Sequence, residues 1–321
     1  MNLEKPNSSR GASLLRWGGS LLSIALMIYL LSRQGWHEIG LALTEIPLWI
    51  FVLAAGLMII SRFAVTGRWY ALLRATDLKT SWGQVLRLTF AGLFATNFLP
   101  TTIGGDIVRL AGAVQYGLDG SVIAASLIAD RLIGMFGMVL MVPFGLLPLL
   151  AWIKSGPIMS GLSSAPIMLL AGNSIFHKIW QKILSILRKI MQAIKYWWQH
   201  PTSLLGSFAF TVVHMLSFFG ILWALFIGLG DPVPFGLVAG LYSFVYLVTL
   251  LPISINGYGL QELSISLIFS QVGGASLHNS LTVALIFRTL TMLASLPGAA
   301  FVPGIIAGRK DSITSLDEVD G

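Results

Sequence analysis

The chain has 321 residues, of which 55% are hydrophobic and only 10% are charged. Because soluble domains carry about 25% charged residues, this composition excludes a soluble globular protein and predicts an all-α, polytopic membrane protein. The net charge is +7, and the basic residues border apolar stretches, so we expect contacts with anionic lipid headgroups in the bilayer and no nucleic acid. Cysteine is absent and the five histidines are scattered, so we expect neither disulfides nor a metal or cofactor.

Nine apolar stretches follow one another along the chain, and several are too short for a full membrane span. A helix that crosses about 30 Å of hydrocarbon needs about 17–25 residues. The stretches at 84–99 and 235–251 are near this limit, end in Leu-Pro and precede glycine-rich turns, and the segments that follow, 104–117 and 260–271, are shorter still. We therefore expect two re-entrant hairpins. The nine stretches are 14–32, 46–61, 84–99, 121–152, 156–172, 202–228, 235–251, 260–271 and 281–303.

The distribution of basic residues favours hairpins over full crossings for these two segments. Lysine and arginine cluster within 5–16, 62–87, 178–195 and 309–310. If both segments form hairpins, all four clusters lie on the cytoplasmic side, as the positive-inside rule requires. The sequence thus predicts an inner-membrane protein with both termini in the cytoplasm and about six full spans plus two hairpins, or seven to eight spans in a conventional count. The alternative is that the Pro/Gly motifs are ordinary kinks or external loops.

The two halves of this arrangement have the same order of elements. Residues 14–152 and 156–303 each contain a helix, a second helix, a hairpin and a last helix, but the second half starts from the opposite face. This order predicts an inverted repeat within one flippase-like membrane domain, residues 14–305, with broken helices near the midplane.

Three further segments lie outside the predicted spans. Over 174–199, isoleucines recur at helical spacing and basic residues fall largely on the other side, which predicts an amphipathic helix on the inner leaflet that joins the two halves. We expect residues 1–13 to form a cytoplasmic tail and residues 306–321 a disordered one.

The first predicted hairpin turns through a motif rich in proline, threonine and glycine. The proline leaves a carbonyl of the preceding turn without its usual partner, and the two glycines allow the backbone to approach a ligand closely. Asp106 then stands at the start of a helical segment, where negative charge is favoured or where it acts as an N-cap. Arg109 lies on the same face, so it can pair with Asp106 or contact a headgroup. The motif residues are Pro100, Thr101, Thr102, Gly104 and Gly105.

The second predicted hairpin carries a related motif, in which Asn256 and Gly257 replace the two glycines. Gly259 adds another flexible position. Glu262 follows and is the only glutamate inside an apolar region, so it can act as a proton carrier or as one half of a structural ion pair. The motif residues are Pro252, Ser254, Asn256, Gly257 and Gly259.

Two arginines stand inside apolar stretches, Arg131 and Arg288. A charge at that depth costs at least about 2.5–3.5 kcal/mol, so such residues are usually paired and mark a functional site. Because arginine binds phosphate with two parallel hydrogen bonds, we predict that Arg131, Arg288 and Arg109 bind a lipid phosphate. The alternative is that Arg131 and Arg288 pair with Asp130 and Glu262 only to hold the bundle together.

Asp130 and Arg131 are adjacent, so on a helix their side chains point about 100° apart and each needs a partner of its own. Asp130 and Glu262 are the candidates for proton coupling or ion pairing. His214 lies within an apolar stretch, where we expect it to hydrogen-bond to a neighbouring helix.

Three motifs in this order resemble those of a known family. They are NFLPTTIGGDIVR at 97–109, ADRLIG at 129–134 and LPISINGYGLQE at 251–262. Together they resemble the transmembrane, flippase-like region of lysylphosphatidylglycerol synthases over roughly residues 14–305. The resemblance implies movement of an aminoacyl-phosphatidylglycerol or polyprenyl-phosphate lipid between leaflets. Those synthases carry a soluble aminoacyl-transferase domain after this region, and this chain stops at Gly321, so we expect no lysyl transfer from tRNA.

Three functions remain open at the level of sequence. The first is a lipid flippase, which is a transporter rather than an enzyme and would draw on an ion gradient, a partner or the lipid gradient, because the sequence has no ATP-binding loop. The second is a membrane-embedded transferase or hydrolase acting on a lipid phosphate, which requires a carboxylate or histidine beside the arginines. The third is a non-catalytic partner of a lipid-modifying enzyme.

Overall fold

A computed structural model gives the fold and describes residues 46–98, 104–155, 199–250, 254 and 257–305. The described residues form helices and contain no strand, which confirms the all-α prediction. The elements are α3 (Leu48–Leu73), α4 (Trp82–Phe98), α5 (Gly104–Gln115), α6 (Gly120–Met141), α7 (Pro143–Ser155), α11 (Pro201–Gly228), α12 (Phe235–Thr249), α13 (Leu260–Gln271), α14 (Leu277–Leu293) and the 3-10 helix η1 (Leu296–Ala300).

Several predicted features lie outside the described residues. The predicted first span, the fifth apolar stretch, the amphipathic helix, both tails and the tips of the two Pro/Gly motifs belong to this group. The segments and residues concerned are 14–32, 156–172, all of 174–199 but its last residue, 1–13, 306–321, Pro100, Thr101, Thr102, Pro252 and Asn256.

Four described helical segments are long and apolar enough to cross a membrane: α3, α6, α11 and the segment from α14 through η1. The predicted stretch 121–152 divides into α6 and α7, because Pro143 has no backbone N–H to continue the helical hydrogen bonds. Conversely, α3 continues to Leu73, well beyond the predicted end of its stretch at residue 61. Arg62 and Arg68, which the sequence placed in a polar stretch after this span, are instead buried within α3.

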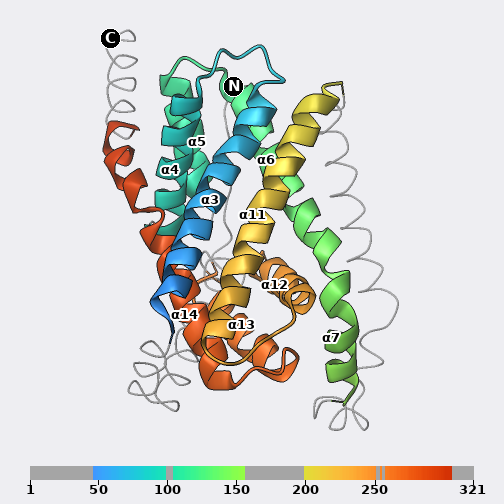
Figure 1. Cartoon of the computed structure of the whole chain (residues 1–321). Helices are drawn as coiled ribbons and strands as arrows, with labels where there is room; N and C mark the ends of the chain where they lie inside the picture. Colours follow the sequence, from blue (N-terminus) through green and yellow to red (C-terminus); the bar gives the residue numbers. More distant parts are fainter. Residues whose placement is uncertain (1–45, 99–103, 156–198, 251–253, 255–256, 306–321) are drawn as a thin grey trace, which may run out of the picture.

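The centre of the molecule is the antiparallel pair of α3 and α11, seen side by side in Figure 1. Gly67 faces Phe210 so closely that a Cβ atom on this glycine would lie 2.6 Å from the ring. The Ser61 hydroxyl and Nδ1 of His214 are hydrogen-bonded at 2.8 Å. This bond confirms the expected role of His214 as a contact between helices.

Two pairs of short helices flank this centre: the first helix pair, α4 and α5, and the second helix pair, α12 and α13. They lie towards opposite ends of the molecule in Figure 1. In the first pair the backbones touch, because a Cβ atom on Gly105 would lie 2.6 Å from the carbonyl oxygen of Gly92. The hydroxyl of Tyr258, just before α13, donates a hydrogen bond to the carbonyl of Asn97, near the end of α4. The two motifs therefore meet in the interior.

Each half of the chain also packs against the helix pair of the other half. After α6, the helix α7 packs on α12, where a Cβ atom on Gly240 would lie 2.0 Å from the backbone nitrogen of Gly145. After α14, η1 packs on α4, where a Cβ atom on Gly298 would lie 2.0 Å from the carbonyl oxygen of Phe90. The packing is thus reciprocal: α7 lies on the second helix pair and η1 lies on the first.

The loop between α11 and α12 is tied to the start of α14. Oδ2 of Asp231 accepts hydrogen bonds from the backbone N–H of Ser276 and from the side-chain amide of Asn279, both at 2.8 Å. Partial burial acts to raise the pKa of Asp231, but these hydrogen bonds outweigh it and lower that pKa.

We expect this contact to make the stability of the protein depend on acid pH. Because the pKa of Asp231 is lower in the folded state, its contribution is present above the unfolded pKa of about 3.9 and is lost as the pH falls through the lower folded pKa. Solvent screens the partly exposed carboxylate, so the contribution is below about 1 kcal/mol. Melting in detergent across this range should show a smaller pH dependence for Asp231→Ala than for wild type. Asp77→Ala, at an exposed carboxylate, is the control; identical profiles for wild type and Asp231→Ala would contradict the assignment.

Candidate functional site

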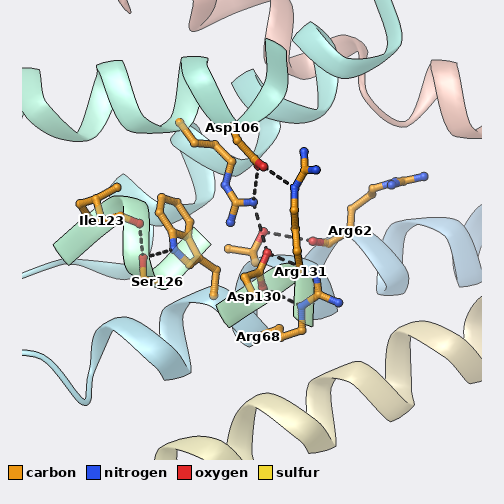
Figure 2. A network of polar contacts seen from close by, with 10 residues as sticks. Arg62, Arg68, Asp106, Ile123, Ser126, Asp130 and Arg131 are labelled. Carbon is orange, nitrogen blue, oxygen red and sulfur yellow. Dashed lines mark hydrogen bonds and ion pairs between the residues drawn. The ribbon is translucent and has the colours of Figure 1, made fainter. Parts of the chain in front are cut away.

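The charged side chains of the first half converge on Asp130, which lies on α6 and is 1% exposed. Arg68 on α3 donates from Nε to Oδ1 at 2.7 Å and from Nη2 to Oδ2 at 3.2 Å, so this pair is bidentate. Arg109 on α5 donates from Nη1 to Oδ2 at 3.3 Å. One buried carboxylate thus joins three helices (Figure 2).

Asp106 extends this network towards the surface. Its Oδ1 lies 3.6 Å from Nη1 of Arg109, which is the i,i+3 pair that the sequence allowed. Its Oδ2 pairs with Nε of Arg131, whose side chain is 51% exposed. The alternative that Arg131 pairs with Asp130 is wrong, because α6 directs these adjacent side chains apart (Figure 2). The N-cap alternative for Asp106 is also wrong, since this residue lies inside the first turn of α5.

The second half contains an equivalent ion pair. Nε of Arg288 on α14 pairs with Oε1 of Glu262, as the structural alternative expected. Nη2 of Arg288 also donates to the carbonyl of Gly257 at 3.3 Å, and its guanidinium lies 4.7 Å from the ring centre of Tyr258. Glu262 stands in the first turn of α13, as Asp106 does in α5. Each half therefore directs an arginine of its last long helix onto the acid at the start of the helix that follows its Pro/Gly motif.

The position of Arg109 is fixed by an aromatic ring and a glycine. Its guanidinium stacks 4.0 Å from the ring centre of Trp69, whose Nε1 donates to the hydroxyl of Ser126 at 3.0 Å. A Cβ atom on Gly92 would lie 2.7 Å from Cγ of Arg109, so only glycine leaves room for this side chain without displacing it. The arginine is thus held between α3 and α4 in one orientation.

Arg62 lies apart from this network, with its side chain directed away from Asp130 (Figure 2). The residue is 4% exposed. Its Nη2 donates to Sδ of Met58 at 3.0 Å, and its guanidinium lies 5.6 Å from the ring centre of Phe218. Among the described residues no carboxylate pairs with Arg62, and its Nε has no hydrogen-bond partner.

The first-half network carries an excess of positive charge. Three guanidinium groups share two carboxylates, and of the three only Arg131 is half exposed. Arg62 adds a buried cation outside the network. Buried cations without a counter-ion are strongly unfavourable, so an excess of this kind points to an anionic ligand. No cluster of histidine and acidic residues that could hold a metal ion occurs in the described part of the chain. The network consists of Arg68, Arg109, Arg131, Asp106 and Asp130.

The structure separates the predicted site residues into two groups. Those of the first half gather around Asp130, and those of the second half around Arg288; no described contact joins Arg131 to Arg288. In the second motif, Gly257 and Gly259 adopt positive φ angles of 70° and 73°, which glycine tolerates. The first group contains Gly104, Gly105, Asp106, Arg109, Asp130 and Arg131, and the second contains Ser254, Gly257, Gly259, Glu262 and Arg288.

Sequence reasoning missed the two buried arginines of α3. A signal was present: the apolar residues Phe63, Ala64 and Val65 follow Arg62, and no proline interrupts the segment up to Leu73. Gly134 of the motif at 129–134 also has a role that was not foreseen. A Cβ atom at this position would lie 2.7 Å from Nη1 of Arg68, so the glycine makes room for the arginine that binds Asp130.

Comparison with known proteins gives one result that covers nearly the whole chain. No curated protein matches the sequence significantly. The family model described as the lysylphosphatidylglycerol synthase TM region matches residues 16–298. This range includes both helix pairs and the ion pairs of Arg131 with Asp106 and of Arg288 with Glu262. The chain therefore belongs to the lysylphosphatidylglycerol synthase TM region family, whose members are integral membrane proteins linked to lipid modification.

Proposed function

We propose that the protein moves a lipid with an anionic, phosphate-bearing headgroup between the leaflets of the cell membrane. The lipid would resemble aminoacyl-phosphatidylglycerol or a polyprenyl phosphate. The observation that carries this proposal is the excess of arginine over carboxylate in the first-half network, where Arg131 is half exposed, together with the buried cation Arg62 beside it. A phosphate matches the planar fork of arginine and supplies the missing negative charge.

The two helix pairs would enter the membrane as re-entrant hairpins from opposite faces, with both chain termini in the cytoplasm. Their helices have 17 and 12 residues in the first pair and 15 and 12 in the second, fewer than the roughly 20 needed to cross. The bond between Tyr258 and Asn97 supports tips that meet at mid-depth. Irregular backbone at that depth is tolerated where protein buries it or where it lines a wet cavity. Such a cavity would provide the path for a polar headgroup.

The two kinds of ion pair suit different tasks in this mechanism. The pair of Arg68 and Asp130 is bidentate and buried, so it would hold the scaffold. The pair of Arg131 and Asp106 is partly exposed, and exposed ion pairs contribute only about 0–1 kcal/mol. A lipid phosphate can therefore displace Asp106 from Arg131 at low cost. Arg288 would receive the phosphate in the second half.

Proton coupling would fall to Glu262 rather than Asp130. Asp130 is engaged by two arginines through both oxygens. Glu262 pairs with Arg288 through Oε1 only, and its buried Oε2 has no hydrogen-bond partner among the described contacts. A proton on Oε2 would weaken the pair with Arg288 and free this arginine for phosphate.

Reconstitution into vesicles tests the proposal. The wild-type protein should move fluorescent phosphatidylglycerol across the bilayer, measured by chemical quenching of the outer leaflet. Arg131→Gln should lower the rate roughly tenfold or more, because a charge-assisted hydrogen bond contributes about 1.5–3 kcal/mol. Because Arg131 is half exposed, this variant should still fold. Arg87→Gln, at an exposed arginine on α4, should transport normally.

The same vesicles separate the competing functions. Unchanged lipid that has moved between leaflets supports transport, while chemically altered lipid in mass spectra supports a transferase or hydrolase. Neither movement nor alteration supports a partner role. Equal rates for wild type and Arg131→Gln would show that this arginine does not bind the transported headgroup.

A further inference from the structure

A small cavity lies beside the first-half network, between α3, α4 and α5. Its volume is about 50 Å³, whereas one water molecule needs about 10–15 Å³ by the same measure. The space is therefore large enough for more than a single oxygen atom. Its polar and glycine lining consists of Thr89, Gly92, Thr96, Gly105, Asp106 and Arg109.

Two residues of the cavity lining carry buried hydrogen-bond donors that have no partner in the described part of the chain. Nε and Nη2 of Arg109 are buried and have no hydrogen-bond partner among the described residues, and the same holds for the hydroxyl of Thr89. Both residues are more than nine-tenths buried, at 7% and 1% exposure. Buried polar atoms are rarely left unsatisfied, so such a cluster requires an explanation such as a ligand.

The free nitrogens of Arg109 specify the chemistry of that ligand. Nε and Nη2 form one edge of the guanidinium, which makes two parallel hydrogen bonds to a carboxylate or phosphate. Arg68 uses the same two nitrogens to bind Asp130. In Arg109 this edge remains free, because Nη1 alone contacts Asp130 and Asp106. The site therefore lacks an acceptor with two oxygens.

The surroundings of Arg109 hold this edge in place without competing for it. Trp69 covers one face of the Arg109 guanidinium. Gly92 allows the stem of Arg109 to lie directly against α4. The carboxylate of Asp106 also lines the cavity, but its oxygens already pair with Arg109 and Arg131, so its charge is compensated.

We propose that this cavity binds a tetrahedral oxyanion, the phosphate of the transported lipid, through the Nε and Nη2 edge of Arg109 and the hydroxyl of Thr89. The inference rests on the proposed function and adds to it a docking position inside the first helix pair. Free inorganic phosphate has the same chemistry, so the test must separate the two sources.

The test measures binding by thermal stabilisation of the purified full-length protein in detergent. The probes are short-chain phosphatidylglycerol, inorganic phosphate and a short-chain diacylglycerol that lacks phosphate. Thr89→Val preserves shape and charge but removes the hydroxyl, and should weaken phosphatidylglycerol binding about fivefold to tenfold. Arg109→Lys keeps the charge that Asp130 needs but lacks the two-nitrogen edge, and should weaken it further. Thr282→Val, at a buried threonine bonded to its own helix, is the matched control.

Each outcome decides the proposal. The site is supported if phosphatidylglycerol stabilises the protein and both Thr89→Val and Arg109→Lys weaken this stabilisation. This holds whether or not free phosphate also stabilises the protein. Stabilisation by free phosphate alone, or equal stabilisation by diacylglycerol, overturns a lipid-phosphate site. Affinities unchanged by both variants overturn it as well and leave the cavity to water. If Thr89→Val and Arg109→Lys bind phosphatidylglycerol as the wild type does and still transport lipid in vesicles, the cavity assignment fails while the proposed function stands. If the wild-type protein moves no lipid, the proposed function itself is wrong.

Discussion

Replacing Asp130 by asparagine should destabilise the protein by about 3–5 kcal/mol, the cost of breaking a buried ion pair from one side. The substitution keeps the shape of the side chain but removes the charge that Arg68 and Arg109 share. Both guanidinium groups would then lie buried without a counter-ion, and α3, α5 and α6 would lose the carboxylate that joins them. Chemical unfolding in detergent micelles measures the loss, with Asp77→Asn at an exposed carboxylate as the control.

A second substitution identifies the cause of this loss. In Asp130→Asn with Arg68→Gln, one of the two stranded charges is gone, so the double variant should recover part of the stability; the coupling between neighbouring groups is expected to be about 0.5–3 kcal/mol. By contrast, Asp106→Asn should cost only about 0–1 kcal/mol, because Arg131 is half exposed and the contact of Asp106 with Arg109 is long, at 3.6 Å. Equal losses for Asp106→Asn and Asp130→Asn would contradict the division into a scaffold pair and an exchangeable pair.

The sequence predicts the helices well where apolar composition alone decides them. The stretch predicted at 202–228 is observed as α11, and the short segments on either side of both Pro/Gly motifs form the two helix pairs. The ion pair of Arg288 and Glu262 could also be predicted from the sequence, because each is the rare charge in its apolar segment and the two are close in the chain. In these cases local composition and the structure agree.

Tertiary pairing is the part that the sequence could not provide. In the sequence, Arg68 is one of several basic residues next to a predicted span, and the positive-inside rule assigns such residues to a cytoplasmic loop. Its partner Asp130 lies 62 positions away, and only the packing of α3 against α6 brings the two together. Because Asp130 is occupied by Arg68, Arg131 forms its ion pair with Asp106 instead. A charge compensated by a distant residue can continue a helix, which is why α3 extends to Leu73.

Arg62→Met should lower lipid transport roughly tenfold or more, the effect of losing a charge-assisted contact of about 1.5–3 kcal/mol. The reason is that Arg62 is a buried cation for which the described residues supply no carboxylate. Its guanidinium lies over the ring of Phe218 on α11, and that ring packs against Phe287, the neighbour of Arg288. Arg62 therefore lies between the first-half network and the second half. The phosphate of the proposed lipid would provide the counter-ion as it passes between them.

The stability of the same variant distinguishes this role from a structural one. Methionine fits the contacts of Arg62 with Met58 and Phe218, and it removes a charge that is costly to bury. Replacing buried charges by apolar residues of similar volume is often neutral or stabilises by about 1–4 kcal/mol, so Arg62→Met should melt at or above the wild-type temperature. A lower melting temperature would mean that Arg62 holds the fold together, and full transport by a stable variant would mean that the headgroup does not contact this residue. Arg87→Met, at an exposed arginine of α4, should change neither quantity, because its charge already lies in solvent or headgroups.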